Sequence, residues 1–331
     1  MWRLYMSDNN MNKERLSIIS KQELEDLEKD VKFFKTRLGN RLAFHEYGDP
    51  SGHPIIFYHG TGSHVHGMLL HKPAVEHGFR IIAPDRPGVA KSDFRKGWTI
   101  IEYAHDIADL ADYLGISTFG AIGISGGGPT LMASAFAIPE KLNCVIDLAC
   151  AMPLYSDPNI VKQLGTADRF YAKLGSKLPL GLFKIPFSVL GILQKLLKSP
   201  KTFIKMFASS LCDADKAIFD RPDFQYLFMR DFQELFRHGS KGPAYDAQTV
   251  YKDWGFNLSD IKIHIEVFQG TADLFIPMEF SNFLEKSAKN VRLNLAKDQG
   301  HFYNVAYGYQ LLNKVKELFY SEKETDTQTK Q

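Results

Sequence analysis

The segment Gly120–Pro129, with the sequence GAIGISGGGP, constrains the fold more than any other stretch of the chain. An apolar run ends at a serine set between glycines, which predicts a strand, a very tight turn at Ser125 and the start of a helix. A reversal within about one residue forces the apex into a strained backbone conformation that costs roughly 1–3 kcal/mol. The residues two positions away must then be small, as Gly123 and Gly127 are. We therefore expect the Ser125 hydroxyl to stand in the open above a helix N-terminus.

Length, charge and cysteine content narrow the class of protein. The 331 residues allow one large domain or two smaller ones. The 40 Lys and Arg against 38 Asp and Glu give a net charge of +2, which does not indicate a nucleic-acid or strongly anionic partner. Cys144, Cys150 and Cys212 lack the spacing of a disulfide framework or a metal site, which favours a reducing, cytoplasmic compartment.

The chain carries no clear targeting or membrane-spanning pattern. Residues 1–30 are charged throughout and lack an apolar core followed by small cleavage-site residues, so no secretory signal is expected. The most apolar segment, Leu178–Leu197, is interrupted by two prolines and two lysines and is a poor candidate to cross a bilayer. We expect a soluble protein without stable membrane insertion.

Apolar runs alternate with helical periodicity over most of the chain. The expected strands are Lys32–Arg37, Arg41–Tyr47, Pro54–Tyr58, Phe79–Ala83, Phe119–Ile124, Leu142–Ala149, Lys262–Phe268 and Val291–Ala296. The expected helices include residues 12–31, Thr99–Leu114 with a capping box formed by Thr99 and Glu102, a helix from Gly126, Met278–Lys289 and Tyr303–Tyr320. This alternation predicts an α/β fold, a mostly parallel sheet with helices on both faces.

The alternation stops between Met152 and Gly255, where the sequence predicts several helices inserted after the sixth strand. We therefore divide the chain into an N-terminal extension (1–31), an α/β core (32–151 and 256–320), a helical cap (152–255) and a charged tail (321–331) that we expect to be disordered.

Three side chains of complementary chemistry follow predicted strands. A serine hydroxyl is a weak nucleophile at neutral pH and needs a base together with a group that orients the base. Ser125, Asp273 and His301 occur in the order of a Ser…Asp…His triad, each in a loop after a strand, and such loops meet at the carboxyl edge of a parallel sheet. Asp147 is the alternative acid, although it lies inside a predicted strand.

Attack on a carbonyl group leaves a negative oxygen that needs hydrogen-bond donors. The backbone N–H of Gly126 is the first candidate for such an oxyanion hole. The loop His59–Gly62 supplies the second, for which we choose Thr61 with Gly62 as the alternative; His59, Gly60 and Gly62 are candidate substrate-binding residues. His59, His64 and His66 have no acidic residue close in sequence, so we expect neither a metal site nor another cofactor.

These motifs resemble those of α/β-hydrolase-fold serine hydrolases with a helical cap, including esterases and proline iminopeptidases. The matching segments are His59-Gly60, Pro84–Asp93, Gly123–Gly127, Gly270–Asp273 and Gly300-His301, and the resemblance covers about residues 32–320. One departure is Ala90, where relatives often have glycine, and it affects loop geometry more than chemistry. The resemblance implies that the helical block stands where the family places its cap. Related enzymes with an aspartate nucleophile, such as epoxide hydrolases and haloalkane dehalogenases, do not match Ser125.

We therefore expect a serine hydrolase that cleaves an apolar carboxylic ester or related small acyl substrate through an acyl-enzyme. An aminopeptidase or amidase, a lactonase, a C–C hydrolase and a non-catalytic small-molecule receptor of the same fold are the alternatives, and a homodimer is left open.

Two features of the helical block bear on packing and on substrate binding. The apolar segments Leu178–Phe183 and Ile185–Leu190 are interpreted as packing onto the core, with an acyl pocket or a lipid-facing surface as alternatives. Asp213, Asp215 and Asp220 are interpreted as solvated helix ends, with pairing to a substrate amine as the alternative.

Overall fold

A computed structural model of the protein describes residues 3–5, 17–153, 158–163, 169, 173, 175 and 177–328. Within these residues, nine strands form one sheet in the order β1-β9-β8-β7-β6-β4-β5-β3-β2. The strands are β1 Arg3–Tyr5, β2 Lys32–Lys35, β3 Arg41–Gly48, β4 His53–Tyr58, β5 Phe79–Pro84, β6 Phe119–Ile124, β7 Leu142–Leu148, β8 Ile265–Gly270 and β9 Val291–Ala296. Only β2 and β3 pair antiparallel with their neighbours, so the predicted mostly parallel sheet is confirmed.

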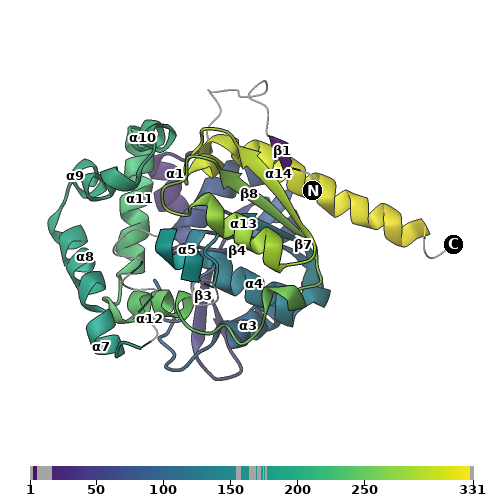
Figure 1. Ribbon diagram of the computed structural model, residues 1–331, viewed down its shortest axis with the longest axis horizontal. Coiled ribbons are helices and arrows are strands. Elements are labelled where there is room, and N and C mark those ends of the chain that lie inside the picture. The colour runs from purple at the N-terminus through teal and green to yellow at the C-terminus, as the bar shows by residue number, and fades with distance from the viewer. Residues whose placement is uncertain are drawn as a thin grey trace.

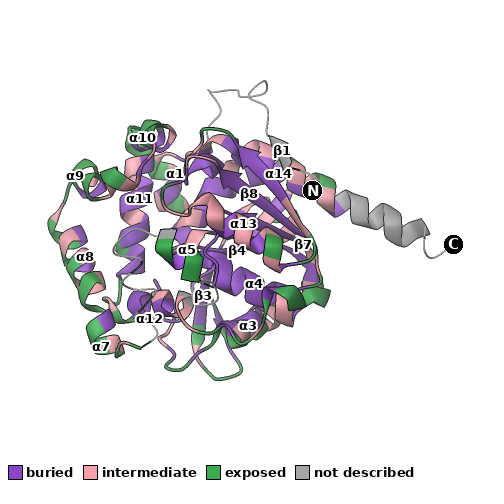
Figure 2. Ribbon diagram, viewed as in Figure 1, coloured by how far each residue is buried: buried purple, intermediate pink, exposed green. Residues whose placement is uncertain are grey.

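Helices cover both faces of this sheet (Figure 1). Helices α3, α4 and α13 pack on one face, whereas α2 and α14 pack on the other. Strands β3 to β9 are mostly buried (Figure 2), as expected when both faces are covered, whereas the edge strand β2 has one buried residue. The α-helices are α1 Lys21–Leu27, α2 His71–His77, α3 Ile100–Tyr113, α4 Gly128–Ala137, α5 Pro158–Gln163, α7 Leu180–Phe183, α8 Ile185–Leu196, α9 Pro200–Ile204, α10 Asp213–Phe219, α11 Pro222–Leu235, α12 Lys241–Val250, α13 Met278–Ser287 and α14 Tyr303–Gln328.

The local signals around α3 are confirmed. The Thr99 hydroxyl accepts the N–H of Glu102 at 3.2 Å, and the Glu102 carboxylate accepts the N–H of Thr99 at 2.9 Å. Gly115 follows the helix with a φ of +72°, a backbone conformation that glycine adopts without strain. Reciprocal capping of this kind satisfies N–H groups that the first helical turn leaves unbonded.

The N-terminal segment differs from the prediction. Of the helix expected over residues 12–31, the structure has only α1, and residues 12–16 lie outside the described residues. Strand β1, which the sequence did not predict, pairs in parallel with β9 at the edge of the sheet. Ile19 and Leu24 are buried in the core, so this segment is part of the packed fold rather than a peripheral extension.

Two further boundaries differ from the prediction. Strand β8 begins at Ile265, three residues later than expected, because its register is set by pairing with β7 and β9 on both sides. Helix α14 continues to Gln328, so most of the tail from Ser321 is helical rather than disordered.

Helices α5 to α12 lie between β7 and β8 in the chain. Figure 1 shows α7 to α12 gathered at one side of the sheet, and α8 packs against α11. The additional strand β1 makes β7 the seventh strand of the chain, whereas the sequence predicted six strands before the insertion.

Candidate active site

The turn at Ser125 has the strained backbone that the sequence predicts. Strand β6 ends at Ile124 and a 3₁₀ turn, η3 Ser125–Gly127, follows at once; Ser125 has a φ of +52°, which is rare for a residue other than glycine. A Cβ atom on Gly127 would lie 2.2 Å from the carbonyl oxygen of Tyr58, and one on Gly123 would lie 2.9 Å from Leu131. Both glycines are therefore needed for the turn to pack against the neighbouring chain.

Asp273 and His301 form a buried hydrogen-bonded pair. His301 Nδ1 lies 2.8 Å from Asp273 Oδ2, while Asp273 Oδ1 accepts the N–H groups of Phe275 and Ile276 at 2.8 and 2.9 Å. These bonds fix the carboxylate, which in turn fixes the orientation of the imidazole ring. Burial disfavours the charged imidazole, but the charge and hydrogen bond of Asp273 raise the pKa of His301 above its ordinary value.

The structure brings Ser125 and His301 to one cavity of about 240 Å³. Aromatic rings from the helical region and from the loops after β8 and β9 form most of its lining, together with Asp231. The lining residues are Thr61, His66, Ser125, Leu190, Phe207, Phe228, Asp231, Phe232, Phe275, His301 and Phe302. An acyl group in this cavity would lie among apolar side chains with a hydroxyl and an imidazole at one end.

The alternative acid, Asp147, lies elsewhere. It is buried within β7, its Oδ1 accepts the N–H of Cys150 at 2.9 Å, and burial raises its pKa to about 7. Because His301 Nδ1 is bonded to Asp273, the structure favours Asp273 over Asp147 as the partner of this imidazole.

The two candidate oxyanion donors are neighbours. A Cβ atom on Gly126 would lie 3.2 Å from the backbone nitrogen of Thr61 and 3.0 Å from its Oγ1. A Cβ atom on Gly60 would lie 3.1 Å from that of Ser125, so the His59–Gly62 loop passes directly beside the serine. The first N–H groups of a helical turn have no partner within it and are free to receive an anion.

His59 is placed differently from the other candidates in this loop. Its side chain is fully buried, Nδ1 lies 2.9 Å from Gly60 O, and Nε2 accepts the N–H of Arg86 at 3.2 Å. Burial and the nearby Arg86 charge hold the pKa of His59 well below its ordinary value. The ring therefore serves to hold the loop rather than to contact a ligand in the Ser125 cavity.

Three aspartates of the helical region hold the loops around Ser125, and sequence reasoning missed all three roles. The first is Asp215 of α10, whose carboxylate accepts the N–H groups of His301 and Phe302 at 3.1 and 3.0 Å. It is fully buried, so the interpretation of Asp215 as a solvated helix end is wrong. Gly300 makes the contact feasible, since a Cβ atom there would lie 2.1 Å from Asp215 Oδ2.

The second aspartate is Asp231 of α11. Its Oδ1 accepts both the N–H and the hydroxyl of Ser63 at 2.7 Å, and a Cβ atom on Gly62 would lie 2.1 Å from its Oδ2. Burial raises the pKa of Asp231 to about 7, while burial lowers that of His66, which faces the same cavity, to about 4. Near neutral pH, the neutral imidazole of His66 and the partly protonated carboxyl group of Asp231 thus face the cavity.

The third aspartate, Asp246 of α12, acts through a buried arginine. Arg86 Nε and Nη2 donate to the two oxygens of Asp246 at 2.6 and 2.8 Å, and its guanidinium also donates to the carbonyl oxygens of His59 and Gly60. A planar guanidinium can serve both partners because its N–H groups point outward in a fixed fork. The helical region is therefore bonded to the candidate oxyanion loop.

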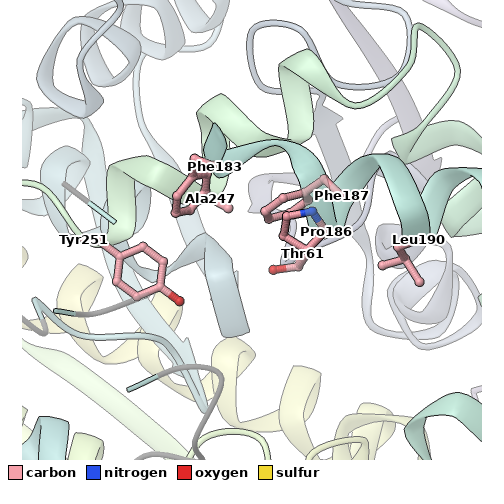
Figure 3. A pocket seen from close by; sticks show the side chains of 7 residues that line it. All are labelled: Thr61, Phe183, Pro186, Phe187, Leu190, Ala247 and Tyr251. Carbon is pink, nitrogen blue, oxygen red and sulfur yellow. The ribbon is translucent and has the colours of Figure 1, made fainter. Parts of the chain in front are cut away.

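A second cavity of about 260 Å³ lies next to the first (Figure 3). Thr61 and Leu190 line both cavities. Its other lining residues come from α7, α8 and α12 and are Phe183, Pro186, Phe187, Ala247 and Tyr251. Helices α7 and α8 thus contribute an apolar pocket in addition to packing onto the core.

His45, His64 and Asp85 bring histidine and carboxylate groups together, and none of the three lines the cavity of Ser125. His64 does have an acidic partner, since its Nδ1 lies 2.9 Å from Asp85 Oδ2, and His45 stacks on His64 with 3.7 Å between ring centroids. Among the described residues, His45, His64 and Asp85 are the group of possible metal ligands, because their ligand atoms all lie within 4.8 Å of one another. Stacked parallel rings direct their in-plane lone pairs side by side rather than toward one point, so the geometry does not suit a metal ion.

Comparison with known proteins agrees with this architecture. A family model described as the alpha/beta hydrolase fold matches residues 53–305. The chain is 24% identical over 271 residues to the 2-hydroxy-6-oxononadienedioate/2-hydroxy-6-oxononatrienedioate hydrolase of Escherichia coli (strain K12), covering 79% of this chain and 85% of that protein. A shorter match of 92 residues, 32% identical, relates it to an uncharacterized hydrolase of Bacillus subtilis (strain 168); it covers 28% of this chain and only about a third, 32%, of that relative.

Among solved structures, an esterase from Exiguobacterium antarcticum superposes with a TM-score of 0.63 at 18% sequence identity, over 87% of this chain and 98% of that one. At this identity the likeness concerns the fold. The family match, which covers most of the chain, establishes that the protein belongs to the α/β-hydrolase family of enzymes.

Proposed function

We propose that the protein is a cytoplasmic serine hydrolase of apolar carboxylic esters, with Ser125 as nucleophile, His301 as base and acid, and Asp273 as the group that orients His301. One observation carries the proposal: Ser125 and the Asp273-bound imidazole of His301 line the same apolar cavity. Ser125 Oγ attacks the ester carbonyl carbon as His301 Nε2 takes its proton. The tetrahedral oxyanion is held by the N–H groups of Gly126 and Thr61.

The rest of the cycle follows from the same groups. The protonated His301 gives its proton to the departing alkoxide, so an alcohol leaves and an acyl group stays on Ser125. A water molecule then loses a proton to His301 and attacks the acyl carbonyl, and Ser125 recovers its proton as the carboxylic acid departs. Helices α5 to α12 act as the cap over this site, and the aspartates of α10 and α11 hold its loops in place.

The chemistry of the lining favours an apolar acyl group over an anionic substrate. The E. coli relative is named for a dioate, which carries two carboxylates, and such a substrate calls for basic side chains. Neither arginine nor lysine is among the residues that line the two described cavities, whereas phenylalanine, leucine and tyrosine are. Each cavity is smaller than the roughly 300–1,000 Å³ of typical ligand pockets, so a longer acyl chain would have to extend through both.

The test uses an active-site probe and one substitution. We expect a fluorophosphonate to label the protein once per chain, and Ser125→Ala to abolish labelling and lower hydrolysis of p-nitrophenyl butyrate at least about 10⁴-fold. Ser134→Ala changes another serine, which is buried on α4, and as the control it should keep both the labelling and the hydrolysis. Full activity in Ser125→Ala would refute the proposal.

Two further measurements separate the alternatives. Sustained turnover after the first acylation distinguishes an enzyme from a small-molecule receptor, which would label and then release no product. A panel of p-nitrophenyl esters, amino-acyl arylamides and lactones then compares substrate classes, and a preference for the arylamides would replace the esterase assignment with an aminopeptidase.

A further inference from the structure

Helices α7 and α8 carry a row of exposed apolar side chains on the side that faces away from the core. Leu182, Ile185, Val189, Ile192 and Leu196 have exposed fractions between 51% and 68%. Along α8 the spacing is four, three and four residues, which places these side chains on one face of the helix. We call these five residues the outer apolar row.

The opposite face of α8 is already used for packing. Gln194 is buried, and a Cβ atom on Gly191 would lie 3.0 Å from the Phe236 ring, so the helix lies close against the segment that follows α11. Phe187 and Leu190 line the cavities described above. Packing onto the core therefore does not account for the outer apolar row, which is a second apolar face on the same helix.

The charge of the segment that carries this row is of one sign. Between Arg169 and Asp213 the chain contains no Asp or Glu. The same stretch has seven lysines, all exposed: Lys173, Lys177, Lys184, Lys195, Lys198, Lys201 and Lys205. The net charge of +2 hides this segregation, because acidic residues elsewhere in the chain offset the lysines.

We propose that the outer apolar row and its surrounding lysines dock the protein on an anionic phospholipid surface. Apolar side chains on one helical face bind at the boundary of headgroups and acyl chains, while flanking lysines reach the lipid phosphates. Each lysine near such a surface strengthens binding by about fivefold. A second copy of this chain that docked through the same face would bring lysines against lysines, which disfavours a symmetric dimer as the occupant.

The docked helix also forms the wall of the second cavity. Pro186, Phe187 and Leu190 face inward from the helix whose outer face meets the lipid, and Leu190 reaches the cavity of Ser125. None of the described helices is long and apolar enough to cross a membrane, and the proposed contact is peripheral. Docking would place a lipophilic ester next to the two cavities. This consequence for the substrate rests on the proposed function, but the docking itself is independent of it.

The experiment is flotation of the full chain with vesicles. We expect binding to phosphatidylcholine vesicles that contain phosphatidylglycerol, at least about tenfold weaker binding to pure phosphatidylcholine, and further loss at high salt. Val189→Ser with Leu196→Ser should weaken binding at least about tenfold, as should Lys195→Gln with Lys198→Gln and Lys201→Gln.

Matched controls remove the same groups elsewhere. Val75→Ser with Leu38→Ser, both exposed apolar residues, and Lys286→Gln with Lys289→Gln and Lys297→Gln should bind as the unchanged protein does. All of these variants should keep the circular-dichroism spectrum and the melting temperature of the unchanged protein, which shows that they fold whether or not the protein is an esterase. Ser125→Ala should float equally well, so failure of the proposed function leaves this result intact.

Three outcomes would overturn the proposal. They are absence of flotation with phosphatidylglycerol vesicles, equal binding by the α8 variants and their controls, and a dimer in sedimentation velocity that the Val189→Ser, Leu196→Ser variant dissociates.

Discussion

Among the described residues, His301 with Asp273 and His64 with Asp85 are hydrogen-bonded histidine–aspartate pairs, and the surroundings of the two pairs differ. His301 and Asp273 are joined at 2.8 Å, and His64 and Asp85 at 2.9 Å; in both pairs the aspartate side chain is fully buried and its charge raises the pKa of the histidine. His301 lines a cavity with Ser125, whereas His64 is stacked on His45, and its Nε2 has no hydrogen-bond partner among the described residues.

The difference teaches that a histidine–aspartate pair is not in itself a catalytic feature. Both pairs have the hydrogen bond and the charge, but only one presents its second ring nitrogen to a space that a ligand could occupy. The first pair is therefore expected to matter for rate and the second for stability. The following predictions test that division.

The largest effect should come from Asp273→Asn. Without the carboxylate, the neutral imidazole loses the group that holds its tautomer and stabilises its charged form, and we expect kcat on p-nitrophenyl butyrate to fall about 10⁴-fold. Asp85→Asn is the matched control and should keep kcat within about tenfold where the protein is folded. Equal losses in the two folded variants would contradict the comparison.

The second effect concerns stability. Asp85→Asn leaves the fully buried His64 without its charge partner, and we expect the free energy of unfolding to fall by about 3–5 kcal/mol in urea titrations at pH 6. The pKa of His64 is raised in the folded state, so below the unfolded-state pKa of about 6.5 the pair makes its full contribution to stability. This contribution is lost as the pH rises through the folded-state pKa of His64. A cost that grows above pH 7 would disprove this assignment.

A third, smaller effect involves Asp231, which is linked to both histidine–aspartate pairs. It lines the cavity with His301, and the charge of His64 lowers its pKa. Its pKa, raised to about 7 by burial, means that the folded state binds more protons than the unfolded state between about pH 4 and pH 7. The unfolding free energy of the unchanged protein, relative to Asp231→Asn, should therefore fall by about 2 kcal/mol from pH 5 to pH 8. A difference that is constant with pH would show that Asp231 is ionised throughout.

The smallest effect is on the pH dependence of the rate. Because the base must be neutral and the pKa of His301 is raised, kcat/KM should rise with pH along a limb whose midpoint lies above 6.5. The Asp215 charge contributes to that rise, so Asp215→Asn should move the midpoint to lower pH by less than about one unit. Asp213→Asn, an exposed neighbour paired with Lys216, is the control and should leave the midpoint unchanged.

Much of the site could be found in the sequence because it depends on short segments. The strained turn at Ser125 needs small residues at 123 and 127, and the loops that end at Asp273 and His301 follow strands whose ends meet at one edge of a parallel sheet. The same logic found the loop of Gly60 and Thr61. Each of these signals is local, so a single chain without relatives is enough to show it.

The residues that hold the site could not be found in this way. Asp215, Asp231 and Asp246 lie on three helices of an irregular region, and each bonds to a loop between 86 and 168 residues away in the chain. In sequence they are aspartates near helix ends or on helix surfaces, which is also the pattern of solvated residues. The sequence predicts Gly62 as an alternative oxyanion donor and substrate-binding residue and Gly300 as part of the motif before His301, but nothing local indicates that Asp231 and Asp215 pack against them.

The sequence by itself determined the alternation of strands and helices, the turn at Ser125 and the order of its candidate partners, since steric limits and periodicity act over a few residues. Tertiary structure alone decided which histidine–aspartate pair faces a cavity, how the aspartates of the helical region hold the loops, and that α8 has apolar side chains on both faces. Those properties depend on which surfaces are covered, and coverage is set by contacts between segments far apart in the chain.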